Sequence, residues 1–431
     1  MKKYTKILIP YFLLFVSIYA SSIIWEYIKI PFEDLEINGI YSELKHHSLN
    51  DPVRYLVFIL LPLTIWFFSY KLLNNFKFSQ LNQSFQLQEI KVSDSRFNNI
   101  IFYLFLCFLI IEYLSLTFPL NIMDLVHEGQ QISSAYKNYL NGELWSSSYI
   151  TVGIFFETLN SSIIWKLFDQ VSFGLFRISG LTYILITKIL ILVFCNNISK
   201  LIFSSDLNKS IFFLILVFIL VNFVDYDLNS PDYLNYREIP ILIGLIFIIK
   251  ILKKNNLQII NIYFFSILSL PSLLWGIDRG LIFNFLLISL AFYFICSKNF
   301  KLLFHLISGV LIFWSIGYFI IGNEFKFFIQ NTLDIFKEMN YVHGLIHPTP
   351  FSDEPNSSRA TKTIILILFT LLISIKLLFN NNKDYKNNLR ILFIFLSLIS
   401  FFSYLYALGR SDGPHIKETF GYPLIFLIIF S

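Results

Sequence analysis

Long apolar stretches alternate with short polar segments along the whole chain. Many of these stretches contain about 17 to 22 residues, the length that an α-helix needs to cross a hydrocarbon core of about 30 Å. We therefore predict an all-α polytopic membrane protein, a single integral-membrane domain over residues 1–431 with about twelve transmembrane helices. The expected spans are residues 7–25, 53–70, 98–118, 175–195, 211–224, 238–252, 257–275, 280–297, 302–321, 362–380, 391–407 and 422–431. The last one stops at Ser431, so either the chain ends abruptly there or the protein continues.

Composition and charge agree with this class. The chain is 56% hydrophobic and only 14% charged, and its mean hydropathy is +0.65. With the N-terminus in the cytoplasm, the cytoplasmic side carries about 19 Lys and Arg against about 4 acids, and the outer side about 14 against about 24. Basic loops resist translocation, so this orientation is favoured and the polar clusters described below lie outside. The net charge of +5 is then a topology signal, with no nucleic-acid patch behind it.

The longest outer segment, residues 119–174, begins with the most concentrated chemistry of the chain. Asp124, His127 and Glu128 are spaced i, i+3 and i+4, so a helix places all three side chains on one face. Two carboxylates and an imidazole beside a membrane are able to move protons, hold a metal or bind a sugar. The alternative is a solvated helix end, where acidic residues are favourable. The triple lacks the spaced partners of a zinc site, so we assign no metal ligand.

The remainder of this outer segment predicts surface helices. Apolar residues recur at helical spacing within residues 130–140, and Asn141-Gly142 marks a helix end. We expect an amphipathic helix that lies along the membrane surface. A second apolar stretch, residues 150–168, is expected to lie in the interface or to dip in and return.

A second polar cluster follows the eleventh span, within residues 408–417. Its glycines and proline predict a tight turn. Arg410, His415 and Lys417 offer hydrogen-bond donors suited to a phosphate at the bilayer surface. Asp412 is placed to pair with Arg410 and orient it. The alternative is an ordinary charged loop that anchors two spans.

Two further outer segments complete the set of candidates. Asp278 and Arg279 stand between two glycines in the turn that joins the seventh and eighth spans, where they either cap helices or add a cation to the site. Residues 322–361 are rich in proline and polar side chains, which favours an outer-face flap over a site.

Several function classes are disfavoured. The chain has no Walker loop, dinucleotide fingerprint, nucleophile elbow or HExxH motif, which argues against ATP-driven and soluble-nucleotide chemistry. It has no convincing internal repeat, a frequent feature of secondary transporters. Glu112 is the clearest acid within a span, whereas proton-coupled carriers usually need several.

The stretch from Asp124 to Arg177 resembles the polytopic bacterial GT-C-type glycosyltransferases and their relatives. The elements that carry the resemblance are His127-Glu128-Gly129, Asn141-Gly142, Ser148-Tyr149-Ile150 and Phe173-Gly174…Arg177. The later Gly409-Arg410-Ser411-Asp412…His415 is similar to an Arg-Ser-Asp-x-x-His element of such proteins. Together these elements cover a small part of the chain.

The resemblance implies a GT-C-like transferase of the bacterial inner membrane, with its N-terminus cytoplasmic and its active face periplasmic. The donor would be a polyprenyl-phosphate-linked sugar, and the acceptor a glycan, a lipid or a protein. Asp124 or Glu128 would act as general base, with His127 orienting the acceptor. The leaving phosphate would be held by cationic side chains, namely Arg410, His415, Lys417 and Arg279. Some relatives use a divalent cation, Mg²⁺ or Mn²⁺, and nothing in this chain demands one.

The chain departs from its relatives at one informative place. Relatives often carry an Asp soon after the amphipathic helix, where this chain has Ser146-Ser147-Ser148. If that Asp serves catalysis in relatives, Glu143 or Glu157 would take over its role here. In GT-C enzymes the catalytic carboxylate also usually lies in the first outer loop, whereas this polar run follows the third predicted span.

Two other functions stay open. A glycan polymerase or ligase of the O-antigen type would also use outer-face arginines and a lipid-linked glycan. A transporter or flippase of lipid-linked glycans is the leading class without catalysis. A transferase keeps its essential charges on one face beside lipid, whereas a carrier needs them reachable from both sides. The charge distribution favours the transferase.

Overall fold

The structure is a computed structural model, and it describes residues 2–30, 49–74, 96–115, 127–203, 205–223, 235–252, 258–343, 346–379, 389–410, 416–417 and 419–431. Within these ranges all regular structure is helical. Eight segments are long and apolar enough to cross a bilayer, in agreement with an all-α integral membrane protein. They are Leu8–Trp25, Asn50–Leu73, Arg96–Ser115, Phe173–Ile202, Gln258–Trp275, Ile277–Cys296, Phe300–Phe336 and Ser357–Leu378.

Four further apolar helices occupy the remaining predicted spans. They are α8 (Asp206–Phe223), α9 (Ile239–Leu252), α17 (Arg390–Arg410) and α19 (Gly421–Phe430). The α9 helix has 14 residues, and at 1.5 Å per residue it is about 21 Å long, short of a hydrocarbon core of about 30 Å. Length and composition therefore support eight crossings, and the count of twelve stays a prediction.

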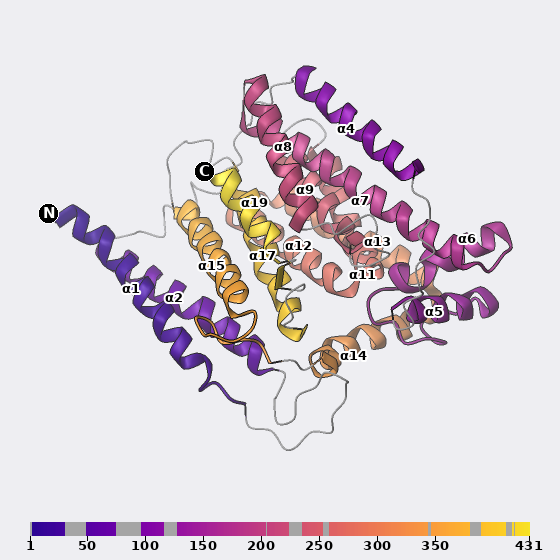
Figure 1. The fold of residues 1–431 in the computed structure, drawn as a ribbon, viewed down its shortest axis with the longest axis horizontal. Coiled ribbons are helices and arrows are strands. Elements are labelled where there is room, and N and C mark those ends of the chain that lie inside the picture. The colour runs from indigo at the N-terminus through magenta and orange to yellow at the C-terminus, as the bar shows by residue number, and fades with distance from the viewer. Residues whose placement is uncertain are drawn as a thin grey trace. The chain divides into compact units, whose positions relative to one another are not determined.

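The chain divides into two compact units. Residues 1–86 and 336–431 form unit 1, and residues 87–335 form unit 2. In unit 1, α1 (Lys2–Trp25) lies along α2 (Asn50–Asn74), and α15 (Ser357–Phe379) packs against α2, α17 and α19 (Figure 1). Its core contains large buried rings, namely Trp25, Tyr55, Phe58, Trp66 and Tyr404. The expectation of a single domain stays a prediction.

Unit 2 is organised around α7 (Phe173–Ile202), which packs against α4 (Arg96–Ser115), α8 and α9 (Figure 1). It also contains two short helices, α10 (Gln258–Ile267) and α11 (Ser269–Trp275), and two long ones, α12 (Ile277–Cys296) and α13 (Phe300–Ile321). The turn between α11 and α12 is tight, because a Cβ atom added at Gly280 would lie 2.5 Å from the backbone of Leu273. Only glycine fits this close helix approach.

A helix covers residues 130–140, as predicted. It is α5 (His127–Asn141), and it ends at Gly142, whose φ of 74° lies in the left-handed region that favours glycine. The apolar stretch that follows forms a π-helical turn, η2 (Phe155–Leu159), continued directly by α6 (Asn160–Phe168). A serine side chain, Ser172, then caps the start of α7 by accepting from the backbone N–H of Leu175.

The segment predicted as an outer flap, residues 322–361, is largely helical. A short turn, η4 (Gly322–Glu324), leads from α13 into α14 (Phe325–His343). Residues 346–356 then run without regular structure, apart from turns, to the start of α15. A role for this segment as a flap over a site stays a prediction.

Candidate functional site

The residues singled out from the sequence differ in how far the structure describes them. Asp124, Asp412 and His415 lie outside the described residues. His127 begins α5 and Arg410 ends α17, and only their backbones are described. The exposed Lys417, like Arg410, belongs to unit 1. The other candidates lie in unit 2 and are described in full: Glu128, Glu143, Glu157, Asp278 and Arg279.

Glu128 is fully buried and paired with Arg177 of α7. The guanidinium donates from Nε to one carboxylate oxygen at 3.0 Å and from Nη2 to the other at 3.1 Å. The same guanidinium lies 4.2 Å from the ring centre of Phe173. A bidentate pair of this kind gives both carboxylate oxygens a partner and anchors α5 to α7. Sequence reasoning noted Arg177 only as part of a motif and did not pair it with Glu128.

Glu157 sits at the centre of the π-helical turn η2 and is 2% exposed. Its carboxylate accepts from the backbone N–H of Thr151 at 2.8 Å, and also from the Thr151 hydroxyl and the Gln130 side-chain amide. Burial raises the pKa of Glu157 to about 6, against the opposing effect of hydrogen bonds from Thr151 and Val152 and of the charge on Arg237. Turns of π-helix are rare and often occur at functional sites.

Two arginines and two further carboxylates lie beside Glu157. Arg279 is paired with Glu238 and with Asp278, the latter at 2.9 Å. The Nη1 atom of Arg237 lies 3.7 Å from Oδ2 of Asp278. The Cζ atom of the same guanidinium lies 4.9 Å from the centre of the Phe156 ring. Among these described side chains, three carboxylates face two guanidinium groups. The set therefore carries one negative charge when every group is ionised, and protonation of Glu157 makes it neutral.

A short segment, residues 150–153, ties η2 to the Asp278–Arg279 turn. The backbone N–H of Ile277 donates to the carbonyl oxygen of Val152 at 2.6 Å. A Cβ atom added at Gly153 would lie 2.4 Å from the carbonyl oxygen of Trp275, so glycine is required where the two backbones meet. The structure thereby brings the Glu157 region and the Arg279 turn together.

An aromatic wall closes one side of this charged cluster. The Tyr236 ring lies 4.7 Å from Phe156 and 5.6 Å from Tyr183, and Trp275 lies 5.1 Å from Tyr183. The Trp275 indole N–H donates to the carbonyl oxygen of Tyr236 at 2.9 Å, and the Asn160 amide donates to the Tyr236 hydroxyl at 3.0 Å. The polar atoms of these two rings are therefore satisfied within the protein, as is usual for buried Tyr and Trp side chains.

The helices around the cluster turn their polar faces inward. On α5 the buried face carries Gln131, Ser134 and Asn138, whereas Leu140 is 60% exposed. On α6 the serines at 161 and 162 are buried, whereas Leu167 is 77% exposed. The exposed side of α5 is mixed, since Lys137 is exposed as well as Leu140, whereas the exposed side of α6 is mainly apolar. An exposed apolar face like that of α6 is unfavourable in water and favourable at a lipid interface. The charged cluster thus lies on the inner side of α6, whose outer face suits lipid.

The other predicted acids differ in environment. Glu143 is exposed just after α5, and its carbonyl oxygen accepts from the Asn138 amide. Asp278 and Arg279 belong to the charged cluster, together with Arg237 and Glu238. From the sequence, Arg237-Glu238 is open to the same two interpretations as Asp278-Arg279, a pair of helix caps or part of a site. The available signal was an adjacent base and acid immediately before an apolar helix, in a segment rich in Asp.

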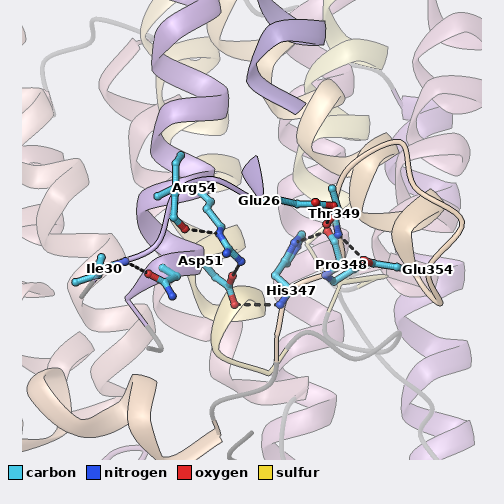
Figure 2. A network of polar contacts seen from close by, with 10 residues as sticks. Glu26, Ile30, Asp51, Arg54, His347, Pro348, Thr349 and Glu354 are labelled. Atoms are coloured by element: carbon cyan, nitrogen blue, oxygen red, sulfur yellow. Dashed lines mark hydrogen bonds and ion pairs between the residues drawn. The ribbon is translucent and has the colours of Figure 1, made fainter. Parts of the chain in front are cut away.

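A separate polar network lies in unit 1 (Figure 2). His347 is buried, and its backbone N–H donates to Asp51 at 3.0 Å. Its ring Nδ1 lies 2.9 Å from the Pro348 carbonyl oxygen and its Nε2 lies 2.8 Å from the Tyr404 hydroxyl. Because a carbonyl oxygen only accepts, Nδ1 carries a proton. Burial lowers the pKa of His347 to about 4, so the ring is neutral at pH 7 and its Nε2 accepts from the Tyr404 hydroxyl. The network thus joins segments of unit 1 that are distant in sequence.

Within the described residues, no group of three or more His, Cys, Asp or Glu side chains is arranged to hold a metal ion. No protein-family model, no curated protein and no solved structure matches the chain. The chemical interpretation of the site therefore depends on the residues themselves.

Proposed function

We propose that the protein is a membrane glycosyltransferase, which moves a sugar from a polyprenyl-phosphate donor to an acceptor hydroxyl on the outer face. One observation carries the proposal. Glu157, a buried carboxylate with a pKa of about 6, lies beside Arg237 and directly before α6, whose outer face is mainly apolar. A general base is most effective when its pKa is near the working pH. A substrate with a lipid tail would reach such a site from the membrane side.

In the proposed reaction Glu157 is the general base, a role for which the sequence first favoured Asp124 or Glu128. The proton of the acceptor hydroxyl moves to Glu157 while the acceptor oxygen forms a bond to the anomeric carbon. The bond between that carbon and the donor phosphate oxygen breaks, and the phosphate leaves with the electron pair. Arg237 and Arg279, both in unit 2, would stabilise its charge. The mechanism is written with the residues of unit 2, and a role of Arg410, His415 and Lys417 in binding the phosphate stays a prediction from the sequence.

The finer topology belongs to the same proposal. The N-terminus lies in the cytoplasm, the twelve apolar helices all contribute to the crossings, and the site faces the periplasm of a bacterial inner membrane. The asymmetry of Lys and Arg between the two sides supports this orientation. The resemblance of residues 124–177 to GT-C-type enzymes supports the reaction class.

The same carboxylate would suit a proton-coupled carrier, which is the second candidate. A buried acid that exchanges a proton near pH 6 is common to both functions. The two differ in what happens to a bound lipid-linked sugar: a transferase cleaves the bond between sugar and phosphate, and a carrier leaves it intact.

The test combines binding and turnover. Gently extracted wild type is examined by native mass spectrometry for a co-purifying polyprenyl-phosphate sugar. Membrane vesicles are supplied with radiolabelled polyprenyl-phosphate sugars, and the release of polyprenyl phosphate is followed. We compare wild type with Glu157→Gln and with Glu143→Gln, an exposed acid on the same outer segment as the matched control.

Glu157→Gln should retain the lipid and lose turnover by about 10²- to 10⁴-fold, because the proton acceptor is gone and the shape of the side chain is kept. Glu143→Gln should behave as wild type. Turnover by Glu157→Gln at the wild-type rate would reject the catalytic assignment. Binding of the lipid-linked sugar without any cleavage by wild type would favour the carrier.

A further inference from the structure

The amphipathic helix α14 has an inward face that reaches the segment before Glu157. Its buried residues Phe328, Asn331 and Ile335 recur at helical spacing. On the opposite side Leu333 and Phe336 are exposed and apolar. Asn331 is the one polar residue of this inward set, and its environment decides what it does.

Asn331 binds the backbone of Ile150 through both ends of its side-chain amide. Its Oδ1 accepts from the Ile150 N–H at 3.0 Å, and its Nδ2 donates to the Ile150 carbonyl oxygen at 2.7 Å. Two further contacts join the same elements. The centres of the Phe328 and Trp145 rings lie 5.1 Å apart, and Glu324 accepts from the backbone N–H of Ser146 at 2.9 Å. A buried side chain that satisfies both backbone polar groups of one residue fixes that backbone firmly.

The next residue, Thr151, provides two of the hydrogen bonds to the Glu157 carboxylate, one from its backbone N–H and one from its hydroxyl. On the far side of Thr151, the Val152 carbonyl oxygen accepts from the backbone N–H of Ile277. Thr151 is therefore held from both sides, by Asn331 at one neighbour and by the α11–α12 turn at the other. The orientation of its backbone N–H and hydroxyl toward Glu157 therefore depends on contacts with α14 and with the α11–α12 turn.

We propose that Asn331 is a positioning residue for Glu157: it fixes residues 150–153 so that both donors of Thr151 reach the carboxylate, and α14 thereby sets how readily Glu157 releases its proton. This inference deepens the proposed function, and its role in catalysis rests on that function. The protonation of Glu157 is nevertheless measurable without any turnover.

Other groups also face Glu157, and they stay in place when Asn331 is changed. The short helix η3 (Asn235–Glu238) contributes Arg237 and Tyr236. From α5 comes the uncharged Gln130, and Asp278 of α12 acts through its pairing with Arg237. Because none of these contacts Asn331 through a described hydrogen bond or ion pair, a change in the titration of Glu157 reports on Thr151.

The test is an infrared difference titration of the purified protein in nanodiscs, in which Glu157→Gln identifies the band of the protonated Glu157 carboxyl. Asn331→Leu keeps the volume and removes both hydrogen bonds. Its titration midpoint should rise by about one pH unit, because donors that favour the ionised form are lost. Thr151→Val, which removes the hydroxyl, should shift the midpoint in the same direction. Thr151→Ser, which keeps a hydroxyl, should have the wild-type midpoint. The control is Thr332→Ala, whose hydroxyl bonds only the Phe328 carbonyl of its own helix among the described contacts.

An unchanged midpoint in folded Asn331→Leu would overturn the proposal, and so would equal midpoints in Thr151→Val and Thr151→Ser. The Thr151 pair keeps the test valid if Asn331→Leu fails to fold. A shifted midpoint together with wild-type protein that never cleaves a lipid-linked sugar would retain the positioning role and reject the transferase. The two proposals therefore fail on different measurements.

Discussion

At the scale of single residues, neighbours decide what a buried glutamate does in this protein. Glu128 and Glu157 are both inaccessible to solvent, yet Glu128 has a bidentate guanidinium partner and Glu157 depends mainly on uncharged donors. A close counter-charge holds a carboxylate ionised, whereas burial with weaker partners brings its pKa toward neutral pH. The first arrangement suits an anchor, and the second suits proton exchange.

The raised pKa of Glu157 predicts a pH-dependent cost in stability. Because the folded-state pKa of about 6 exceeds the ordinary value of 4.5, the folded protein binds the proton more tightly than the unfolded chain does. The contribution of Glu157 to stability is then most favourable below pH 4.5, falls as the pH rises through 6, and stays lower above it. Glu157→Gln removes this effect and should be more stable than wild type at pH 8 by about 2 kcal/mol.

Melting temperatures measured in nanodiscs from pH 4.5 to pH 8 check this prediction. The gain from Glu157→Gln should vanish at the acidic end of the series, and Glu143→Gln should show no gain at any pH because Glu143 is exposed. A Glu157→Gln protein that melts below wild type at pH 8 would show that the ionised carboxylate stabilises the fold instead.

At the scale of elements, the apolar pattern of the sequence predicted where the helices lie. It did not predict which side chains meet between them. Apolar spacing and Asn141-Gly142 predicted α5 closely, and the twelve apolar stretches all proved to be helices. The π-helical turn at Glu157 has no local signal, because it covers only 5 residues, and a helical period is read over a window of about 11 to 18 residues. The pairing of Glu128 with Arg177 and of Arg279 with Glu238 depends on tertiary packing, which one sequence does not encode as a pattern.

The exposed leucines of α5 and α6 predict direct contact of these helices with lipid. Spin labels placed at Leu140→Cys and Leu167→Cys should be more accessible to oxygen, which partitions into the bilayer, than to a water-soluble nickel complex. A label at Glu143→Cys, exposed in the loop after α5, should show the opposite preference. Power-saturation spectroscopy in nanodiscs gives both values. Preference for nickel at Leu140 and Leu167 would place these helices in water and remove the membrane-side route to the site.

At the scale of the whole molecule, unit 1 is assembled from two distant parts of the chain. The network of Asp51, Arg54 and His347 holds them together, with Arg54 also donating to the Ile28 carbonyl oxygen (Figure 2). Nothing in the sequence around His347 indicates its contact with Asp51. A contact across such a separation leaves no trace in local patterns.

His347 predicts that unit 1 loses stability in acid. Its pKa is about 4 when folded and 6.5 ordinarily, so the unfolded chain binds the proton more tightly. Stability is therefore complete above pH 6.5 and falls as the pH drops toward 4, by about 3 kcal/mol for a shift of this size. The exchange rate of the backbone amides within residues 346–350, taken relative to the intrinsic rate at each pH, should rise in nanodiscs as the pH falls from 6.5 to 4. In His347→Gln, an uncharged polar replacement, this rise should be absent, and its persistence would assign it to another group.

The distance along the chain between Asp51 and His347 has a consequence for biosynthesis. The two residues are 296 positions apart, so at about 5 to 20 residues per second the ribosome needs about 15 to 60 seconds to produce the second after the first. During that interval the α1–α2 hairpin is already available for insertion, and the Asp51 carboxylate lacks its backbone partner. Unit 2 is synthesised entirely within the same interval. Unit 1 therefore closes last although it begins first, and the early hairpin depends on the insertion machinery for protection until the end of the chain arrives.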